Sequence, residues 1–236
     1  MPSPEPSQES KPTGPTELIP LFPLGAVLFP GLVLPLHIFE QRYQELVTDV
    51  EAMPEGQQEF GVVAIKLGRE VGSDGIKALH AVGCTAALRE IDKYPDGRSD
   101  LVTVGHRRFV IHSLVESKPY LQARVSWLPE EPGEAAEVLQ NSVARRFVQY
   151  RQMLLAARGL ELAQPDEIPD SAEILSYLVA AATILDLADR QRLLAAPTTT
   201  ERLRAELDLL RSEVGLLRAI PSVPGGEYAR ASYVPN

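Results

Sequence analysis

Cysteine is nearly absent from this sequence of 236 residues, in which Cys84 is the only one. A lone cysteine cannot close a disulfide within the chain, so a packed core must stabilise the fold, as is usual in a reducing compartment. Aromatic residues make up only 6% of the sequence, yet 44% of it is hydrophobic, which is sufficient for one large domain or two small ones. We therefore expect a globular, cytoplasmic protein.

An excess of positive charge is also lacking, because 23 Lys and Arg residues stand against 32 Asp and Glu residues and the net charge is −9. Such a chain as a whole repels phosphate backbones and anionic lipid surfaces. Nucleic acid is therefore disfavoured as a partner, and no membrane partner is expected.

No segment has the composition of a secretory signal or a membrane-spanning helix. Residues 1–16 hold five prolines and no apolar run, which predicts a disordered tail. The uncharged stretch Leu18–Phe39 is long enough to cross a bilayer, but its four prolines would each remove a helical hydrogen bond. We expect short strands there.

The first half of the chain has the pattern of a sheet with one short helix. Tyr43, Leu46, Val47 and Val50 form the apolar side of that helix, and Lys66–Leu79 is Gly-rich and charged, which predicts a mobile loop. The expected elements, in chain order, are strands Leu18–Leu24 and Leu32–Phe39, helix Glu40–Met53, and strands Phe60–Ile65, Val82–Lys93, Leu101–Leu114 and Leu121–Trp127. The turn Tyr94-Pro95-Asp96-Gly97 should join the two longest strands as a hairpin, in a mostly antiparallel sheet that is closed or nearly so.

After Pro129–Gly133 the hydrophobic period changes from two to about three and a half, which indicates helices. The expected helices are a long one containing Leu139–Ala157, one over Ile174–Leu185 capped at Asp170, a short one over Leu187–Ala196, and one capped at Thr198. In the last helix, Leu203, Leu207, Leu210, Val214 and Leu217 have heptad spacing over only about two heptads, which favours a bundle packing face over a coiled coil.

Motifs that carry chemistry are missing. The sequence has no phosphate-binding loop, no Gly-x-Ser-x-Gly elbow and no His-Glu-x-x-His pair. His80 and Cys84 have no second ligand pair, and the carboxylates Glu130 and Glu131 lie in a loop, where solvated charge is the simpler interpretation. No catalytic, cofactor-binding or metal-binding residue is therefore predicted, and no cofactor.

Two basic stretches remain. Strand alternation would place Arg107 with Phe109 on one face and His106 with Arg108 on the other, so the cluster is interpreted as a sheet edge or a pair of salt-bridged arginines rather than as an anion site. The arginines of the long helix are interpreted as a solvated face; they are Arg145, Arg146, Arg151 and Arg158.

A composite signature opens the chain and continues along most of it. Its segments are Leu21-Phe22-Pro23-Leu24, Val27-Leu28-Phe29-Pro30-Gly31, Leu34-Pro35-Leu36-His37-Ile38-Phe39-Glu40, Arg42-Tyr43, Phe60-Gly61-Val62-Val63, Val82-Gly83-Cys84-Thr85, Gly105 with Arg107-Arg108-Phe109, and Asp189-Arg190-Gln191 with Leu193-Leu194. On these residues the chain resembles the Lon substrate-binding domain family over about Glu17–Leu217, although Gly25-Ala26 stands where the family usually has charged residues.

The resemblance implies an α+β fold, with a PUA-like, mostly antiparallel β pseudo-barrel of about six strands and one short helix, followed by a C-terminal helical bundle. The expected boundaries are a disordered tail at 1–16, the barrel at 17–130, the bundle at 134–219 and a flexible tail at 220–236. In full Lon proteases this domain recognises unfolded or tagged proteins ahead of the motor, and cereblon carries a related module. The chain ends where Lon would continue into its ATPase and Ser-Lys peptidase, so unassisted proteolysis is not expected.

The leading hypothesis is a non-catalytic module that binds unfolded or tagged polypeptides or a protein partner, as an adaptor in protein quality control. An RNA-binding PUA-like protein and a small-molecule enzyme are the alternatives. Glu40 and Arg42 are expected to lie too close in a helix to pair with each other, so each would anchor to the barrel. The candidate contact residues, each of which also has a structural explanation, are Phe29, His37, Arg42, Tyr43, Arg107 and Arg108.

Overall fold

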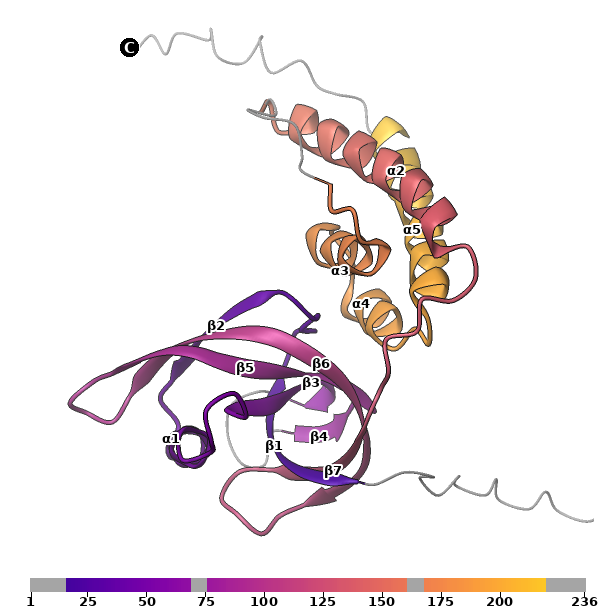
Figure 1. Ribbon diagram of the computed structural model, residues 1–236. Coiled ribbons are helices and arrows are strands. Elements are labelled where there is room, and N and C mark those ends of the chain that lie inside the picture. The colour runs from indigo at the N-terminus through magenta and orange to yellow at the C-terminus, as the bar shows by residue number, and fades with distance from the viewer. Residues whose placement is uncertain (1–15, 69–75, 161–167, 220–236) are drawn as a thin grey trace, which may run out of the picture. The chain divides into compact units, whose positions relative to one another are not determined.

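The structure is a computed structural model that describes residues 16–68, 76–160 and 168–219 (Figure 1). It divides into two compact units. The first, here the barrel unit, is the described part of Met1–Pro129 together with Asp186–Ala195, and the second, the helical unit, is Glu130–Leu185 with the described part of Ala196–Asn236. The tails predicted at 1–16 and 220–236 lie outside the described residues, apart from Thr16.

The barrel unit contains seven strands, one more than expected. They are β1 (Glu17–Leu24), β2 (Val33–Ile38), β3 (Glu59–Gly68), β4 (Ile76–Leu79), β5 (Val82–Lys93), β6 (Ser99–Val115) and β7 (Gln122–Trp127). Antiparallel pairs join β1, β7, β6, β5 and β3 in that order, and a parallel pair between β1 and β3 closes the ring. β4 is attached to β3 and β2 to β6 (Figure 1). The mostly antiparallel, closed sheet and the α+β class are thus confirmed.

Most strand expectations hold, with one correction. The uncharged stretch 18–39 forms β1 and β2, and none of the described helices is both long and apolar enough to span a bilayer. The hairpin of β5 and β6 turns at Tyr94-Pro95-Asp96-Gly97, where Gly97 has a positive φ of 88°. Lys66–Leu79 is not wholly a loop, since β3 continues to Gly68 and β4 begins at Ile76, while 69–75 lie outside the described residues.

The interior of the barrel is filled around the fully buried ring of Phe109. Gly83 and Gly61 make room for it, because a Cβ on Gly83 would lie 2.3 Å from Phe109 Cζ and one on Gly61 would lie 2.8 Å from the same atom. Such glycines allow a large ring to sit against the backbone of two paired strands.

Replacement of Gly83 by Ala is expected to lower the free energy of unfolding by about 1–3 kcal/mol, because the added methyl overlaps Phe109 in a packed interior. Gly215 provides the control, since a methyl there meets no atom within 4 Å and should raise helix stability by up to about 1 kcal/mol. Urea denaturation of both variants measures the two effects. If the Gly83 and Gly215 variants were equally stable, the barrel interior would accommodate the added methyl group without strain.

Two helices belong to the barrel unit. α1 (Gln41–Glu51) buries Tyr43, Leu46, Val47 and Val50, the side that the sequence predicts. α4 (Leu187–Leu194) lies in sequence within the range expected to form the bundle, yet it groups with the barrel. Its Gln191 Nε2 donates to the carbonyl oxygen of Val82 at 2.9 Å, which fixes the helix to the start of β5.

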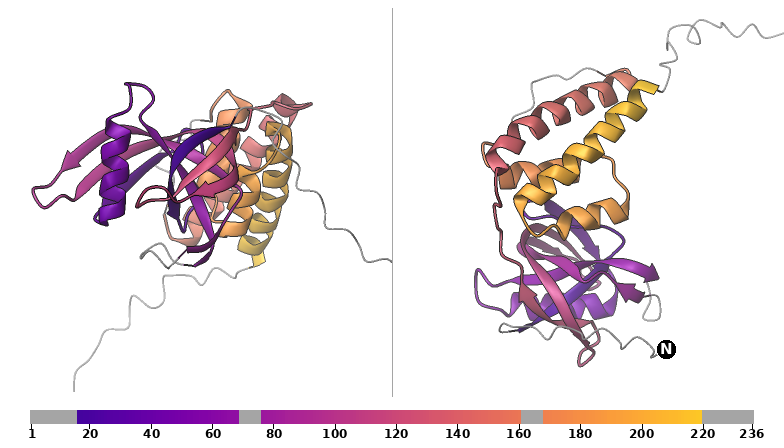
Figure 2. Two further views of the ribbon diagram at one scale, coloured as in Figure 1. Left: turned by 90° about the horizontal axis from the view of Figure 1, so that it is seen from below. Right: turned by 90° about the vertical axis from the view of Figure 1, so that its right-hand side faces the viewer.

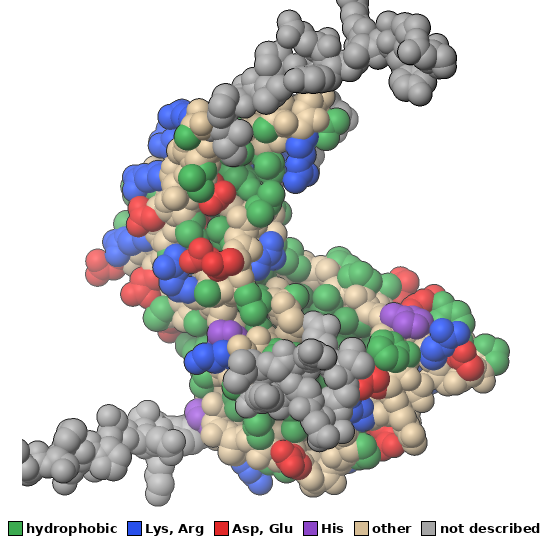
Figure 3. Space-filling model, turned by 180° about the vertical axis from the view of Figure 1, so that it is seen from behind, with side chains coloured by type: hydrophobic (Ala, Val, Ile, Leu, Met, Phe, Trp, Pro, Cys, Tyr) green, Lys and Arg blue, Asp and Glu red, His purple; other side chains and the backbone are tan. Residues whose placement is uncertain are grey.

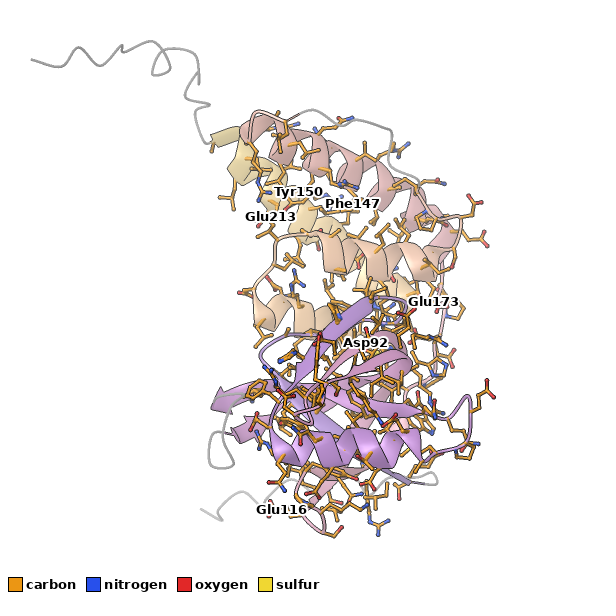
Figure 4. The ribbon with its side chains drawn as sticks, turned by 90° about the vertical axis from the view of Figure 1, so that its left-hand side faces the viewer. Asp92, Glu116, Phe147, Tyr150, Glu173 and Glu213 are labelled. Atoms are coloured by element: carbon orange, nitrogen blue, oxygen red, sulfur yellow. The ribbon has the colours of Figure 1, made fainter. Side chains whose placement is uncertain are left out.

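The helical unit is built from α2 (Ala136–Ala157), α3 (Ala172–Ala182) and α5 (Thr199–Ala219), with α2 and α5 packed side by side (Figure 2). Phe147 and Tyr150 lie on the inner side of α2 (Figure 4). The core consists of Val143, Phe147, Tyr150, Leu175, Val179, Leu203, Leu210 and Val214. The heptad-spaced residues of α5 therefore form a bundle packing face, as expected.

The caps of these helices differ in how well the sequence predicts them. Thr198 Oγ1 accepts from the backbone N–H of Glu201 at 3.1 Å, as the cap pattern indicates. At α3, the cap is Ser171 rather than Asp170, with Ser171 Oγ accepting from Ile174 N–H, and the helix ends at Ala182, before Leu185. Both Asp and Ser are favourable N-cap residues, so the local backbone conformation decides which of Asp170 and Ser171 caps the helix.

Candidate functional site

A small open pocket of about 120 Å³ lies in the barrel unit beside the end of β1, the end of β2 and the start of α1. We call it the β2–α1 pocket. Its lining residues are Phe22, Pro23, Leu24, Leu36, His37, Phe39, Glu40 and Tyr43. Apolar side chains predominate, and charge enters only at one edge. Two of the candidate contact residues, His37 and Tyr43, therefore line one pocket.

Two aromatic rings in contact, tilted by 31° to each other, form part of the wall of this pocket. The buried ring of Tyr43 lies 4.2 Å from that of Phe22, centroid to centroid, and the guanidinium carbon of Arg42 lies 4.5 Å from the Tyr43 centroid. Arg42 Nη2 is also 3.0 Å from Glu40 Oε2. This ion pair helps to hold the Arg42 guanidinium over the Tyr43 ring. A cation over an aromatic face and an ion pair both favour this position.

The expectation that Glu40 and Arg42 cannot pair is wrong. It assumed that both residues lie in the helix, where positions two apart face different directions. Glu40 is the N-cap of α1 and has an extended backbone, with φ −76° and ψ 133°. Its side chain therefore does not follow helical geometry, and Glu40 Oε2 lies 3.0 Å from Arg42 Nη2.

The outer edge of the pocket carries an exposed aromatic side chain, Phe39, with 53% of its surface accessible. His37 lies next to it, with ring centroids 6.2 Å apart, and His37 Nδ1 is 2.5 Å from Asp100 Oδ1. Tyr94 donates its hydroxyl to Asp100 Oδ2 at 2.6 Å. Figure 3 shows hydrophobic, histidine and charged side chains gathered at one end of the barrel unit.

Asp100 holds the polar side of this edge together. Hydrogen bonds from Tyr94 and then His37 lower the pKa of the Asp100 carboxyl, and the same bond raises the pKa of the Tyr94 phenol. The carboxylate thus favours its ionised form and holds both His37 and Tyr94, of which His37 lies beside Phe39. Because the group is exposed, its effect is on orientation rather than on stability.

Phe39 and Asp100 are the functional candidates that sequence reasoning missed. Phe39 ends the apolar stretch expected to form a strand, a position that is more often part of a core than of a contact site. The available signal was its position immediately before the start of a helix, where strand alternation no longer applies. Asp100 gave no local signal, since it meets His37 only through the pairing of β2 with β6.

The remaining candidate residues lie elsewhere in the barrel unit. Phe29 is fully buried and belongs to the core. Arg108 is 1% exposed, and its guanidinium donates to the carbonyl oxygens of Leu194 at 2.8 Å and Pro129 at 3.2 Å. It therefore fastens α4 and the end of β7 to β6, which is a structural role.

Arg107 forms a salt bridge, as expected, but the predicted division of faces is wrong. Between the pairs Cys84 with Arg108 and Ala86 with Gly105, β6 has two residues opposite one on β5, which is a β-bulge. His106 and Arg107 consequently both reach Glu59, at 2.9 Å from His106 Nδ1 and 2.9 Å from Arg107 Nε. The expected alternation fails at this bulge.

This cluster is closed by an aromatic ring. The guanidinium carbon of Arg107 lies 3.4 Å from the centroid of Trp127. Burial opposes ionisation of Glu59, but hydrogen bonds from His106, Arg107 and Thr85 outweigh it and lower the pKa of the carboxyl. The Arg107 side chain donates to Glu59 and packs over the Trp127 ring. Its contacts are therefore with other parts of the fold.

Within residues 16–68, 76–160 and 168–219, no group of three or more His, Cys, Asp or Glu side chains is arranged to hold a metal ion. Cys84 is buried within β5.

Comparison with known proteins agrees with this architecture. The chain is 27% identical over 209 residues to the Lon protease of Cytophaga hutchinsonii and 28% identical over 205 residues to that of Escherichia coli, covering 85% of this chain in both cases. It spans about a quarter of the length of these relatives.

Solved structures show the same fold. The Lon N-terminal domain protein from Xanthomonas campestris has a TM-score of 0.57 at 26% identity, covering 81% of this chain and 98% of that one. The N-terminal domain of the Mycobacterium avium complex Lon protease has a TM-score of 0.58 at 18% identity, covering 83% and 98%. Residues 18–212 match the family described as the ATP-dependent protease La (LON) substrate-binding domain, and the chain therefore belongs to that family.

Proposed function

We propose that this chain binds segments of unfolded or tagged polypeptides, or of a protein partner, at the β2–α1 pocket, and that it does so without catalysing a reaction. The observation that carries the proposal is Phe39, a large aromatic side chain left 53% exposed beside a pocket with apolar walls. Exposed aromatic side chains next to apolar pockets are typical of contact sites. Membership of the LON substrate-binding family supports the same role.

The size of the pocket favours a side chain over a free small molecule. Pockets for drug-sized ligands usually enclose about 300–1,000 Å³, whereas this one has about 120 Å³. One apolar side chain of a bound polypeptide would contact Phe39, Leu24 and Leu36, with its backbone outside.

The free edge of β2 limits how such a segment can lie. Gly105 N–H donates to the carbonyl oxygen of Leu32, so by alternation the backbone groups of Val33, Pro35 and His37 point away from β6. Within the described part of the chain β2 pairs with β6 alone. Pro35 has no N–H to offer at the middle of this edge, which disfavours addition of a regular strand. Recognition would depend on side chains.

By holding a polypeptide at this site for another component, the chain would act as an adaptor in protein quality control. Binding of polypeptides is the part of the role that the pocket supports directly.

Replacement of Phe39 by Ala tests the proposal. Binding of a fluorescently labelled unfolded polypeptide, such as reduced and carboxymethylated α-lactalbumin, should weaken by roughly 10–100-fold, because a Phe side chain buried on binding contributes about 1.5–3 kcal/mol. Fluorescence anisotropy measures the dissociation constants of both proteins.

The matched control is Leu114→Ala, which removes an exposed apolar side chain of β6 outside the pocket and should change binding less than about twofold. Equal binding by the Phe39 variant and the unchanged protein, or no binding of unfolded polypeptide by either, would rule the site out.

A further inference from the structure

The helical unit has a second candidate site, which the proposed function does not use. A pocket of about 330 Å³ lies along the junction of α2 and α5. We call it the arginine pocket. It is lined by Ser142, Arg145, Arg146 and Gln149 of α2 and by Leu207 and Arg211 of α5. Three arginines from two helices thus line one pocket, although the sequence analysis interpreted the arginines of α2 as a solvated face.

Within the described residues, the positive charge of the pocket is only partly compensated. Arg211 Nη1 is paired with Asp208 Oδ1 at 2.8 Å, whereas Arg146 Nη1 donates to the neutral amide oxygen of Gln149 at 2.8 Å. The only acidic residue of α2 is Glu137, in its first turn. Three guanidinium groups and one neighbouring carboxylate therefore leave two positive charges, in a protein whose net charge is −9.

This charge and geometry match a phosphate group. A phosphate monoester carries about 1.5–2 negative charges at pH 7 and three acceptor oxygens. A carboxylate has one charge and two oxygens, which a single guanidinium can satisfy in bidentate fashion, so three arginines exceed what it needs. The hydroxyl of Ser142 and the side-chain amide of Gln149 add donors at the same wall. The volume also leaves room for the group that bears the phosphate.

From these observations we propose that the arginine pocket binds the phosphoryl group of a phosphorylated ligand. The ligand is held by Arg145, Arg146 and Arg211, with Arg211 exchanging part of its contact with Asp208. Small phosphate compounds and phosphorylated side chains of a polypeptide both present a phosphoryl group. They differ in the chemical group that bears it.

The test uses the full chain and three probes, which are inorganic phosphate, a phosphoserine peptide and the same peptide without phosphate. Isothermal titration calorimetry should detect binding of at least one phosphorylated probe that is tighter than any binding of the unphosphorylated peptide. Binding of inorganic phosphate as tight as that of the phosphopeptide identifies a small phosphate compound as the ligand type, and tighter binding of the phosphopeptide identifies a polypeptide.

The double variant Arg145→Gln with Arg146→Gln should bind at least about tenfold more weakly. Its control is Arg204→Gln with Arg218→Gln, which removes the same charge from exposed positions of α5 outside the pocket lining and should change binding less than about twofold. Equal losses in the two double variants, or equal binding of the phosphorylated and unphosphorylated peptides, would overturn the proposal. Phe39→Ala should leave phosphate binding unchanged, so the two sites are tested separately.

Discussion

Replacement of Arg202 by Met is expected to lower the free energy of unfolding of the helical unit by about 3–5 kcal/mol, as for other buried ion pairs from which one partner is removed. Arg202 has no exposed surface. Its Nη1 donates to Ser176 Oγ at 2.9 Å, its Nη2 lies 3.5 Å from Glu130 Oε2, and its guanidinium carbon lies 3.9 Å from the Tyr177 centroid. Methionine fills much of the volume but leaves these groups without their cation.

Urea denaturation followed by circular dichroism at the helix band measures this loss. Arg204→Met is the matched control, since Arg204 lies two residues further along α5 and is exposed, so its loss should change stability by no more than about 0.5 kcal/mol. If the two variants were equally stable, the buried arginine would contribute nothing beyond its packing.

The second large effect concerns Glu206, one turn after Arg202 in α5. Its side chain is 1% exposed, and neither carboxyl oxygen has a hydrogen-bond partner within the described residues. Burial raises the pKa of Glu206 well above 4.5, although the charge of Arg202 acts in the opposite direction. Burial therefore favours the neutral form of this carboxyl in the folded protein.

The sign of the pH dependence follows from this raised pKa. Below about pH 4.5 the carboxyl is protonated in both the folded and the unfolded chain, so its full contribution to stability is present. As the pH rises towards the pKa of the folded state, only the unfolded chain loses its proton, and that contribution is lost. Glu206→Gln removes the titration, so the variant should gain about 1.4 kcal/mol relative to the unchanged protein for each pH unit in this window.

Denaturation of both proteins between pH 5 and pH 8 measures that gain. The control is Glu213→Gln, which makes the same substitution on the same helix (Figure 4) at a less buried position. A difference between the Glu206 variant and the unchanged protein that stays constant with pH would show that the carboxyl titrates alike in both states.

Local patterns were sufficient to predict much of the fold. Alternation located the strands, Pro95 and Gly97 marked the hairpin, and the apolar spacing of α1 predicted which side is buried. These features depend on residues close in sequence, so their physical cause is visible in the sequence itself.

The errors arose where partners distant in sequence decide the conformation. The bulge at His106 and Arg107 depends on the register between β5 and β6. The pair of Glu40 with Arg42 depends on where α1 begins, and the assignment of α4 to the barrel depends on contacts of Arg108 with Leu194, 86 residues apart.

The candidate site was recovered in part for the same reason. His37 and Tyr43 line the β2–α1 pocket and Arg42 lies over Tyr43, whereas Phe29 and Arg108 are buried in structural roles. The packing around an aromatic or cationic side chain decides whether that side chain is exposed. The residues of a motif alone do not reveal this packing.

The grouping of α4 with the barrel bears on how the protein is made. The chain leaves the barrel unit after Pro129, returns at Asp186 and leaves again after Ala195. During synthesis, the seven strands emerge from the ribosome long before the helix that binds Arg108 and Val82. The barrel unit is therefore complete only after some sixty further residues have been synthesised. A single proteolytic cut after Pro129 would separate the seven strands from α4 and so divide the barrel unit, whereas both segments of the helical unit would stay on one fragment.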